Sequence, residues 1–315
     1  MAWPTFPLDS VSLGLLAVAA ILALFDVENL RLKELNLPIL GIGLESRIAK
    51  AKRQVASAQV SNSVVAPAPP AIVEQSLTLV VPALGGISAQ NVGQPTGPWL
   101  AAPAGPLERL LGAAELIRIE LIVIAGNGGY LPFRLPWQSY KATDLALILA
   151  ARQVIPKGLQ DAISVIAETR EVLDDRGPAE DPRVVDRASD LALDVLRKLM
   201  KVKRDYQRVR IARVPVFGDE ELATRAGMEA VMIEQLNDDG RVTSQHVFPT
   251  QERYEAGEYV TWEWDMGRIF RAPAWFRDPD TQTTKQAWQS ATSFAGRAYP
   301  REWDVRPPGA TTRTN

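Results

Sequence analysis

The chain has 315 residues, of which 46% are hydrophobic and 23% are charged, and its formal net charge is -2. These values are ordinary for globular proteins and give no overall attraction to nucleic acid or to anionic lipid. The sequence contains no cysteine and one histidine, His246. Disulfides, thiol catalysis and thiolate metal sites are therefore excluded, and histidine triads and multi-histidine zinc sites lack their residues. We expect no metal and no cofactor, because the dinucleotide-binding, Walker, nucleophile-elbow and H-E-x-x-H motifs do not occur.

Residues 1–26 are predicted to form a single membrane anchor. The run from residue 11 to residue 25 carries no charge, but it is shorter than the about 20 residues that cross a bilayer, so the preceding apolar flank must add length. Lys and Arg follow the run and none precedes it, which places the N-terminus outside and the body in the cytoplasm. A cleaved signal peptide and a buried core helix remain the alternatives. The residues assigned to the anchor are Trp3, Val11, Leu15, Ile21 and Phe25.

Two connecting segments are predicted behind the anchor. Residues 27–58 form the first, with two short extended pieces broken at Pro38 and Gly41 and a basic helix from Ser46 to about Ala58. Such a helix could contact anionic headgroups, although a solvated connector is the commoner explanation. Residues 59–103 are rich in Ala, Pro, Val, Ser and Gly, with Glu74 as their one charge, which predicts a linker.

Residues 104–208 show the apolar spacing of four amphipathic helices. We expect helices over residues 107–124, 139–153 and 157–173, and a fourth that begins at Asp181-Pro182 and carries an apolar stripe from Val184 to Tyr206. The glycines of residues 126–129 end the first helix. Four such helices with short connections predict a bundle, which could assemble with a second copy or with a protein partner.

Residues 209–306 change to the period of two that is typical of strands. A hairpin is expected around the turn at residues 237–240, and a strand over residues 258–266. Residues 307–315 are expected to be a frayed tail. The predicted fold class is therefore α+β, with an N-terminal transmembrane helix, a four-helix-type bundle and a small C-terminal antiparallel β domain.

Five of the eight tryptophans lie between residues 262 and 303. Such a stretch could stack on sugars, peptides or bases. The alternation puts Trp262 and Trp264 on one face, which favours a place in the core for both. The candidates for ligand binding are Trp275, Trp288 and Trp303.

Three other polar patterns have an ordinary structural explanation beside a functional one. Residues 278–281 (Asp-Pro-Asp-Thr) could bind calcium, but an Asp/Pro turn is favoured because no further acidic ligands follow at loop spacing. Glu263 and Asp265 are spaced like a catalytic carboxylate pair, but a solvated strand face is favoured. Arg241 and His246 match R-x4-H in a predicted strand, so we interpret His246 as structural.

Residues 105–205 resemble the HEPN-type helical domains of prokaryotes. Ile119-Glu120-Leu121 fits the I-E-x-x-L-type helix, and Arg170 matches the arginine of the R-N-x-x-x-H element. Glu171 stands in place of the asparagine, and Asp175 stands in place of the histidine. In active members Arg and His act together on a phosphodiester, whereas an ionised Asp175 would repel it. The resemblance therefore implies a degenerate member used for binding or assembly, with Arg170 and Asp175 as the catalytic candidates if activity survives.

Together these patterns predict a membrane-tethered, non-catalytic interaction or assembly protein. One alternative is an effector that acts on nucleic acid through the bundle. A second alternative is a carbohydrate- or peptide-binding β module presented at the membrane. The expected partners are the lipid bilayer, through the anchor, and a second copy or a protein partner, through the bundle.

Overall fold

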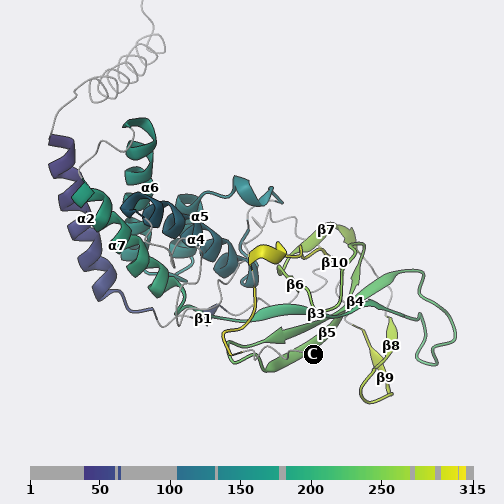
Figure 1. Cartoon of the computed structure of the whole chain (residues 1–315). Helices are drawn as coiled ribbons and strands as arrows, with labels where there is room; N and C mark the ends of the chain where they lie inside the picture. The colour runs from purple at the N-terminus through teal and green to yellow at the C-terminus, as the bar shows by residue number, and fades with distance from the viewer. Residues whose placement is uncertain are drawn as a thin grey trace, which may run out of the picture. The chain divides into compact units, whose positions relative to one another are not determined.

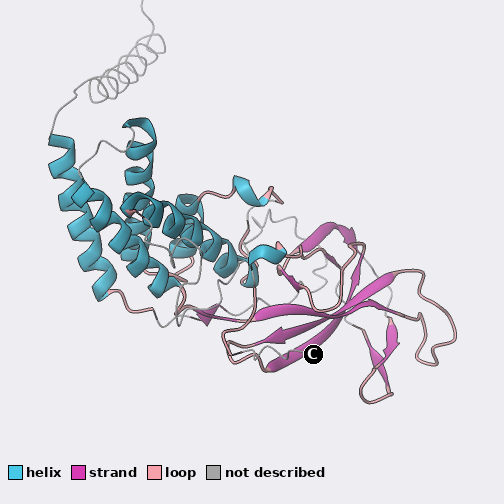
Figure 2. Cartoon of the chain, in the orientation of Figure 1, coloured by secondary structure: helices cyan, strands magenta, loops and turns pink. Residues whose placement is uncertain are grey.

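The computed structural model describes residues 39–60, 63–64, 105–131, 134–176, 182–269, 274–287, 292–303 and 305–309. The predicted anchor and nearly all of the predicted linker lie outside these residues. No helix in the described ranges is long and apolar enough to cross a membrane. Contacts divide the chain into two units, residues 1–44 and residues 45–315. In the second unit most helices and most strands form separate groups (Figure 2), and most strands follow the helices along the chain.

The four predicted helices of the bundle are confirmed as α4 (Pro106–Asn127), α5 (Ala142–Ala151), α6 (Lys157–Arg176) and α7 (Pro182–Leu199) (Figure 1). Helix α4 is followed by Gly129, which takes the left-handed conformation that glycine favours at a helix end. Helix α7 ends before Val202 and Tyr206, the last two positions of the predicted stripe. Both are nevertheless buried, so apolar spacing alone could not reveal where the helix stops.

Helix α2 (Ile39–Ser57) begins directly after Pro38, so the extended piece predicted through residue 45 is wrong. From Glu45 onward α2 is a fifth helix of the bundle and not a solvated connector. Its side chains Ile48, Ala51 and Val55 are buried. Ion pairs join it to two neighbours, from Arg47 to Glu168 on α6 at 2.6 Å and from Lys52 to Asp190 on α7 at 3.2 Å.

The β region is built around one six-stranded sheet with the strand order β6-β3-β4-β5-β10-β7. All neighbouring pairs are antiparallel except β10 and β5, which are parallel. The predicted hairpin is confirmed as β4 and β5, and the Asn237 Oδ1 atom accepts the N–H groups of Asp239 and Arg241 in its turn. Two strand pairs stand apart from the sheet, the parallel pair β1–β2 and the β8–β9 hairpin. The strands are β1 (Ser63–Val64), β2 (Lys203–Arg204), β3 (Tyr206–Val214), β4 (Glu229–Leu236), β5 (Val242–Thr250), β6 (Tyr259–Val260), β7 (Trp264–Ile269), β8 (Trp275–Arg277), β9 (Thr284–Gln286) and β10 (Thr292–Phe294).

The six-stranded sheet curls until its two edges meet. The edge strands β6 and β7 are consecutive in the chain and are separated only by residues 261–263. In that gap the Thr261 N–H donates to the Arg297 carbonyl at 3.0 Å, and the Trp262 N–H donates to the Gly126 carbonyl of α4 at 3.1 Å. The continuous strand predicted over residues 258–266 is therefore wrong in its middle, because the backbone there bonds to residues far away in the sequence.

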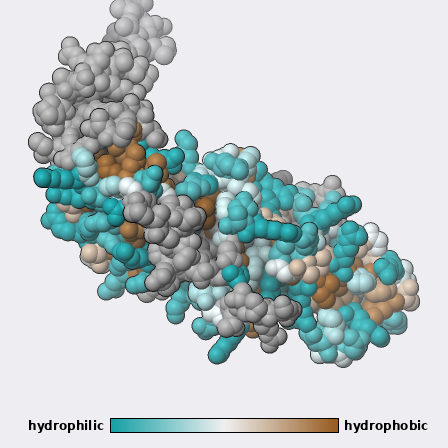
Figure 3. Space-filling model, viewed as in Figure 1, coloured by the Kyte–Doolittle hydropathy of each residue, from teal (hydrophilic) through white to brown (hydrophobic). Residues whose placement is uncertain are grey.

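Aromatic side chains fill the inside of the curled sheet. Trp262 and Trp264 lie edge-on to each other at 5.4 Å, and both pack against Phe248 and Phe294. The predicted core position of Trp262 and Trp264 is confirmed. A second apolar cluster lies where the β8–β9 hairpin packs on the sheet; its buried members are Val214, Val216, Ala230, Met232, Val247, Ala274, Phe276 and Ala287. The molecular face drawn in Figure 3 is mainly hydrophilic, with hydrophobic residues gathered in a few places.

Arg297 ties the curled sheet to the segment between α4 and α5. Its guanidinium lies 4.2 Å from the ring centroid of Trp137 and donates to the Leu135 carbonyl at 2.7 Å and the Tyr140 hydroxyl at 2.9 Å. The same group pairs with Glu263 at 3.0 Å. Glu263 is therefore mostly buried and ion-paired, which corrects the expectation that it lies on a solvated face.

A second polar contact between the helices and the β region is fully buried. Glu120 on α4 pairs with Arg204 on β2 at 2.7 Å, and neither side chain is more than 2% exposed. Nearby, the buried Gln207 side chain donates to the Asn127 carbonyl, and the Tyr299 hydroxyl donates to the Asn127 side chain. Buried polar groups offset the free-energy cost of desolvation only when their hydrogen bonds have good distances and angles. These contacts therefore determine the position of the α4 C-terminal end on the β region.

The frayed tail predicted from residue 307 is wrong for its first three residues. Pro307 is buried, and the Gly309 N–H donates to the Asp238 carbonyl in the β4–β5 turn at 2.9 Å. Residues 307–309 are therefore packed and not frayed. Residues 310–315 lie outside the described residues.

Candidate functional site

Arg208 and Arg210 lie together on the outer face of β3, because successive side chains on a strand point to opposite faces and Val209 between them is buried in the inner core. In the pairing of β3 with β4, Val209 lies opposite Ile233 and Ile211 lies opposite Met232, so a β-bulge follows directly after Val209. The bulge brings Ile211 to the same outer face as Arg210, where Ile211 packs against a second apolar cluster.

Arg208 and Arg210 line an open groove, which we call the Arg210 groove. It is bounded by β3, β4 and β5, the Gly257 turn and the tip of the β8–β9 hairpin, and has a volume of about 540 Å³. The hairpin covers the neighbouring part of the same outer face through the second apolar cluster. The groove is thus the part of that face which the hairpin leaves open. Its lining residues are Arg208, Val209, Arg210, Glu234, Gln245, Gly257 and Asp280.

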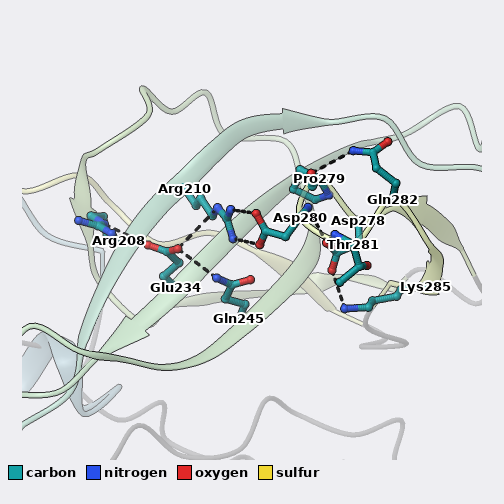
Figure 4. A network of polar contacts seen from close by, with 10 residues as sticks. All are labelled: Arg208, Arg210, Glu234, Gln245, Asp278, Pro279, Asp280, Thr281, Gln282 and Lys285. Carbon is teal, nitrogen blue, oxygen red and sulfur yellow. Dashed lines mark hydrogen bonds and ion pairs between the residues drawn. The ribbon is translucent and has the colours of Figure 1, made fainter.

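Glu234 organises the floor of the groove (Figure 4). Its carboxylate is 6% exposed and accepts hydrogen bonds from Arg208 Nη2 at 2.6 Å and from Gln245 Nε2 at 3.1 Å. Arg210 Nε lies 3.6 Å from the same carboxylate. A buried carboxylate with this many donors holds the side chains around it in one arrangement.

The hairpin tip supplies the other wall of the groove. Arg210 donates through both terminal nitrogens to the two carboxylate oxygens of Asp280, a two-point pairing between the sheet and the hairpin (Figure 4). Asp278 fixes the tip, because its side chain accepts the N–H groups of Asp280 at 2.8 Å and Thr281 at 3.0 Å. Lys285 pairs with the second Asp278 oxygen at 2.6 Å. The predicted Asp/Pro turn is confirmed, and within the described ranges no group of acidic or histidine side chains is placed to hold a metal ion.

The charged groups of the hairpin tip are held in their ionised forms. The hydrogen bonds from Arg210 lower the pKa of Asp280, and the bonds to Asp280 raise the pKa of Arg210. The Lys285 ammonium, with the Thr281 N–H, holds the pKa of Asp278 well below its usual range. General acids and bases work best with a pKa near the ambient pH. These groups are thus suited to binding by charge and hydrogen bonds, and not to proton transfer.

The catalytic candidates from the sequence lie elsewhere. Arg170 is exposed on α6, and Asp175 lies on the same helix with its side chain outside the described residues. Glu120, from the helix that resembles the HEPN motif, is buried in its pair with Arg204. The HEPN resemblance itself stays a prediction.

The remaining candidates are not brought together into one site. Trp275 is half-buried on β8, and Trp303 is half-buried on the short helix η2 (Arg301–Trp303), where it packs against Trp137 at 5.5 Å. Trp288 lies outside the described residues, as do Trp3, Val11, Leu15, Ile21 and Phe25. His246 lies on β5 as predicted, with its ring stacked on Phe248 at 5.6 Å, and burial lowers its pKa.

Sequence reasoning did not identify Arg208, Arg210, Glu234 or Gln245 as site residues. Part of the signal was present, because the Asn237–Gly240 turn sets the β4–β5 register that places Glu234 opposite Gln245. The approach of Asp280 to Arg210, from 70 residues away, has no local signature.

Comparisons with protein-family models, with curated proteins and with solved structures find no match to this chain.

Proposed function

We propose that the chain is a non-catalytic interaction protein, tethered to a membrane by residues 1–26, and that it recognises its partner through the Arg210 groove. The observation that carries this proposal is the pair of arginines on the outer face of β3, which line an open groove that the β8–β9 hairpin leaves uncovered. Glu234 and Asp280 hold the two guanidinium groups in place there.

The charge state of the groove favours binding over catalysis. Arg208 pairs with Glu234, and Arg210 pairs with Asp280, so each guanidinium already has a carboxylate partner. The shifts of the Arg210 and Asp280 pKa values away from neutrality leave both groups charged at pH 7. Fixed charges of this kind give orientation and specificity to a complex.

The bundle serves as the support for the groove in this proposal. Gln207 on β3 faces Asn127 at the end of α4, while the next residue, Arg208, lines the groove. Successive side chains on a strand point to opposite faces, so one strand is anchored to the bundle and presents the recognition surface. The alternative use of the bundle is assembly, for which the exposed Leu147 on α5 is the most accessible large apolar side chain in the described ranges, at 56%.

Site-specific photo-crosslinking separates groove recognition from bundle assembly. Benzoylphenylalanine is placed at Ala256, an exposed residue on the rim beside Gly257, and in a second variant at Leu147 on α5. Groove recognition predicts a discrete adduct from Ala256 in the native membrane and none above background from Leu147. Adducts from Leu147 alone would replace this proposal with bundle assembly.

The tether is tested separately by cell fractionation. The uncharged run at residues 11–25 and the basic residues that follow it support an anchor with the body in the cytoplasm. Removal of residues 1–26 is expected to release the chain from the membrane fraction. A truncated chain that still sediments with membranes, and is resistant to a salt wash, would place the anchor elsewhere.

A further inference from the structure

The two-point contact between Arg210 and Asp280 resembles the bound state of a carboxylate receptor. A guanidinium offers two parallel N–H groups at the spacing of two carboxylate oxygens, and both are used here. Arg210 is 26% exposed, lines the groove and has its fork against Asp280. The occupant comes from the chain itself, from the tip of a separate hairpin.

We propose that Arg210 is the receptor for a carboxylate side chain of an acidic peptide segment in the partner, and that Asp280 is a built-in competitor which that side chain displaces. This rests on the proposed function of the Arg210 groove. The carboxylate class follows from the planar, two-point geometry with which Arg210 already holds Asp280.

Displacement of Asp280 is physically accessible. The Asp280 side chain is 53% exposed, and half-exposed ion pairs contribute little to stability. The fold of the hairpin tip does not depend on that pair, because Asp278 accepts the backbone N–H groups and Lys285 closes the turn. The hairpin also keeps its apolar contacts through Phe276 and Ala287. Asp280 can therefore leave Arg210 while the hairpin stays folded.

The groove then has the charge that an acidic segment requires. With Asp280 displaced, the two arginines face one glutamate, Glu234, and the local balance becomes positive by one charge. Arg208 stays paired with Glu234 and keeps the floor of the groove in place. An incoming carboxylate would restore neutrality at Arg210.

The inference is tested by binding of a fluorescent, capped hexaglutamate peptide to the full-length protein in detergent micelles at low ionic strength. Asp280→Asn removes the competitor, and we expect affinity to rise about two- to five-fold, because the free energy of the surface ion pair no longer has to be overcome before the peptide binds. The double variant Asp280→Asn/Arg210→Gln is expected to lose that gain. A hexaglutamine peptide that is capped at its N-terminus only, and so keeps a free C-terminal carboxylate, reports whether the terminal group alone suffices. Tighter binding of that peptide than of hexaglutamate would overturn the side-chain assignment.

Glu229→Gln is the matched control, because Glu229 also faces an arginine across β3 and β4, Arg213 at 3.9 Å, and both are exposed. It removes the same charge and is expected to leave affinity unchanged within two-fold. Equal gains in Asp280→Asn and Glu229→Gln, or a gain that survives Arg210→Gln, would overturn the inference by showing a general charge effect. A groove-dependent adduct at Ala256 without any hexaglutamate binding would overturn the carboxylate ligand and leave the proposed function standing.

Discussion

Replacement of Glu120 by Gln should destabilise the fold strongly, because it leaves one charge without its partner in the interior. Glu120 is fully buried on α4, and Arg204 on β2 is 2% exposed, with 2.7 Å between their side chains. Glutamine keeps the shape of the side chain and removes the negative charge, so the Arg204 guanidinium becomes an uncompensated buried charge. Removal of one partner from such a pair costs about 3–5 kcal/mol of unfolding free energy. That is a large share of the roughly 5–15 kcal/mol by which folded proteins are stable.

The assay is urea unfolding of the full-length chain, followed by tryptophan fluorescence. Asp194→Asn is the control, since its partner Arg197 on the same helix face of α7 is 62% exposed and the change should cost less than about 0.5 kcal/mol. The double variant Glu120→Leu/Arg204→Met removes both charges and should recover most of the loss. If Glu120→Gln lowers the unfolding free energy no more than Asp194→Asn does, Glu120 and Arg204 are not a buried ion pair. The described contact between α4 and β2 is then incorrect.

Two further predictions concern the curled sheet. Burial lowers the pKa of His246, so the folded state favours the neutral ring; stability is present above the unfolded pKa of about 6.5 and is lost as pH falls below it. The melting temperature should fall less between pH 7.5 and pH 5.5 in His246→Gln than in the unsubstituted chain. An equal fall in both chains would show that His246 does not cause this pH dependence. Gly296→Ala should cost about 1–3 kcal/mol, because its Cβ would lie 2.2 Å from the Thr261 carbonyl oxygen where the sheet closes. Gly43→Ala, a helical position with open space around it, should be neutral or stabilising by up to about 1 kcal/mol in the same thermal melts, and the Gly296 argument fails if both variants behave alike.

Local chemistry was sufficient for several elements of the fold. Helices α4 to α7 follow from apolar spacing and from the glycines and prolines that bound them. The turn at Asp278 follows from the capacity of an aspartate to bond the backbone two and three residues on, which the structure contains. Such features depend on neighbours within one turn of the chain, so the sequence displays them directly.

Non-local contacts decided the features that sequence reasoning missed. The Leu and Gly alternation before Ser46 resembles a strand, but α2 is stabilised by α6 and α7, whose residues lie more than 100 positions away. The clean alternation of residues 258–266 is interrupted because Trp262 bonds to the end of α4. The alternation of apolar and polar residues indicates which side chains are buried. It does not indicate which segment the backbone forms hydrogen bonds with.

The candidate site was hidden for the same reason. Arg210 gains its partner Asp280 from the β8–β9 hairpin, which follows β7 in the chain and packs on the outer face of the sheet. The motif-based candidates, in contrast, are distributed over α6, β8 and η2 without forming one constellation among the described residues.

The most direct test of recognition through the Arg210 groove is the yield of photo-adduct from Ala256 in the native membrane, measured with Arg210 intact and with Arg210→Gln. Both chains should fold alike, because Arg210 lies on the surface of the groove and outside both apolar clusters. Recognition through the groove predicts a discrete adduct that Arg210→Gln reduces several-fold. An adduct of equal yield in both chains, or none in either, would contradict it.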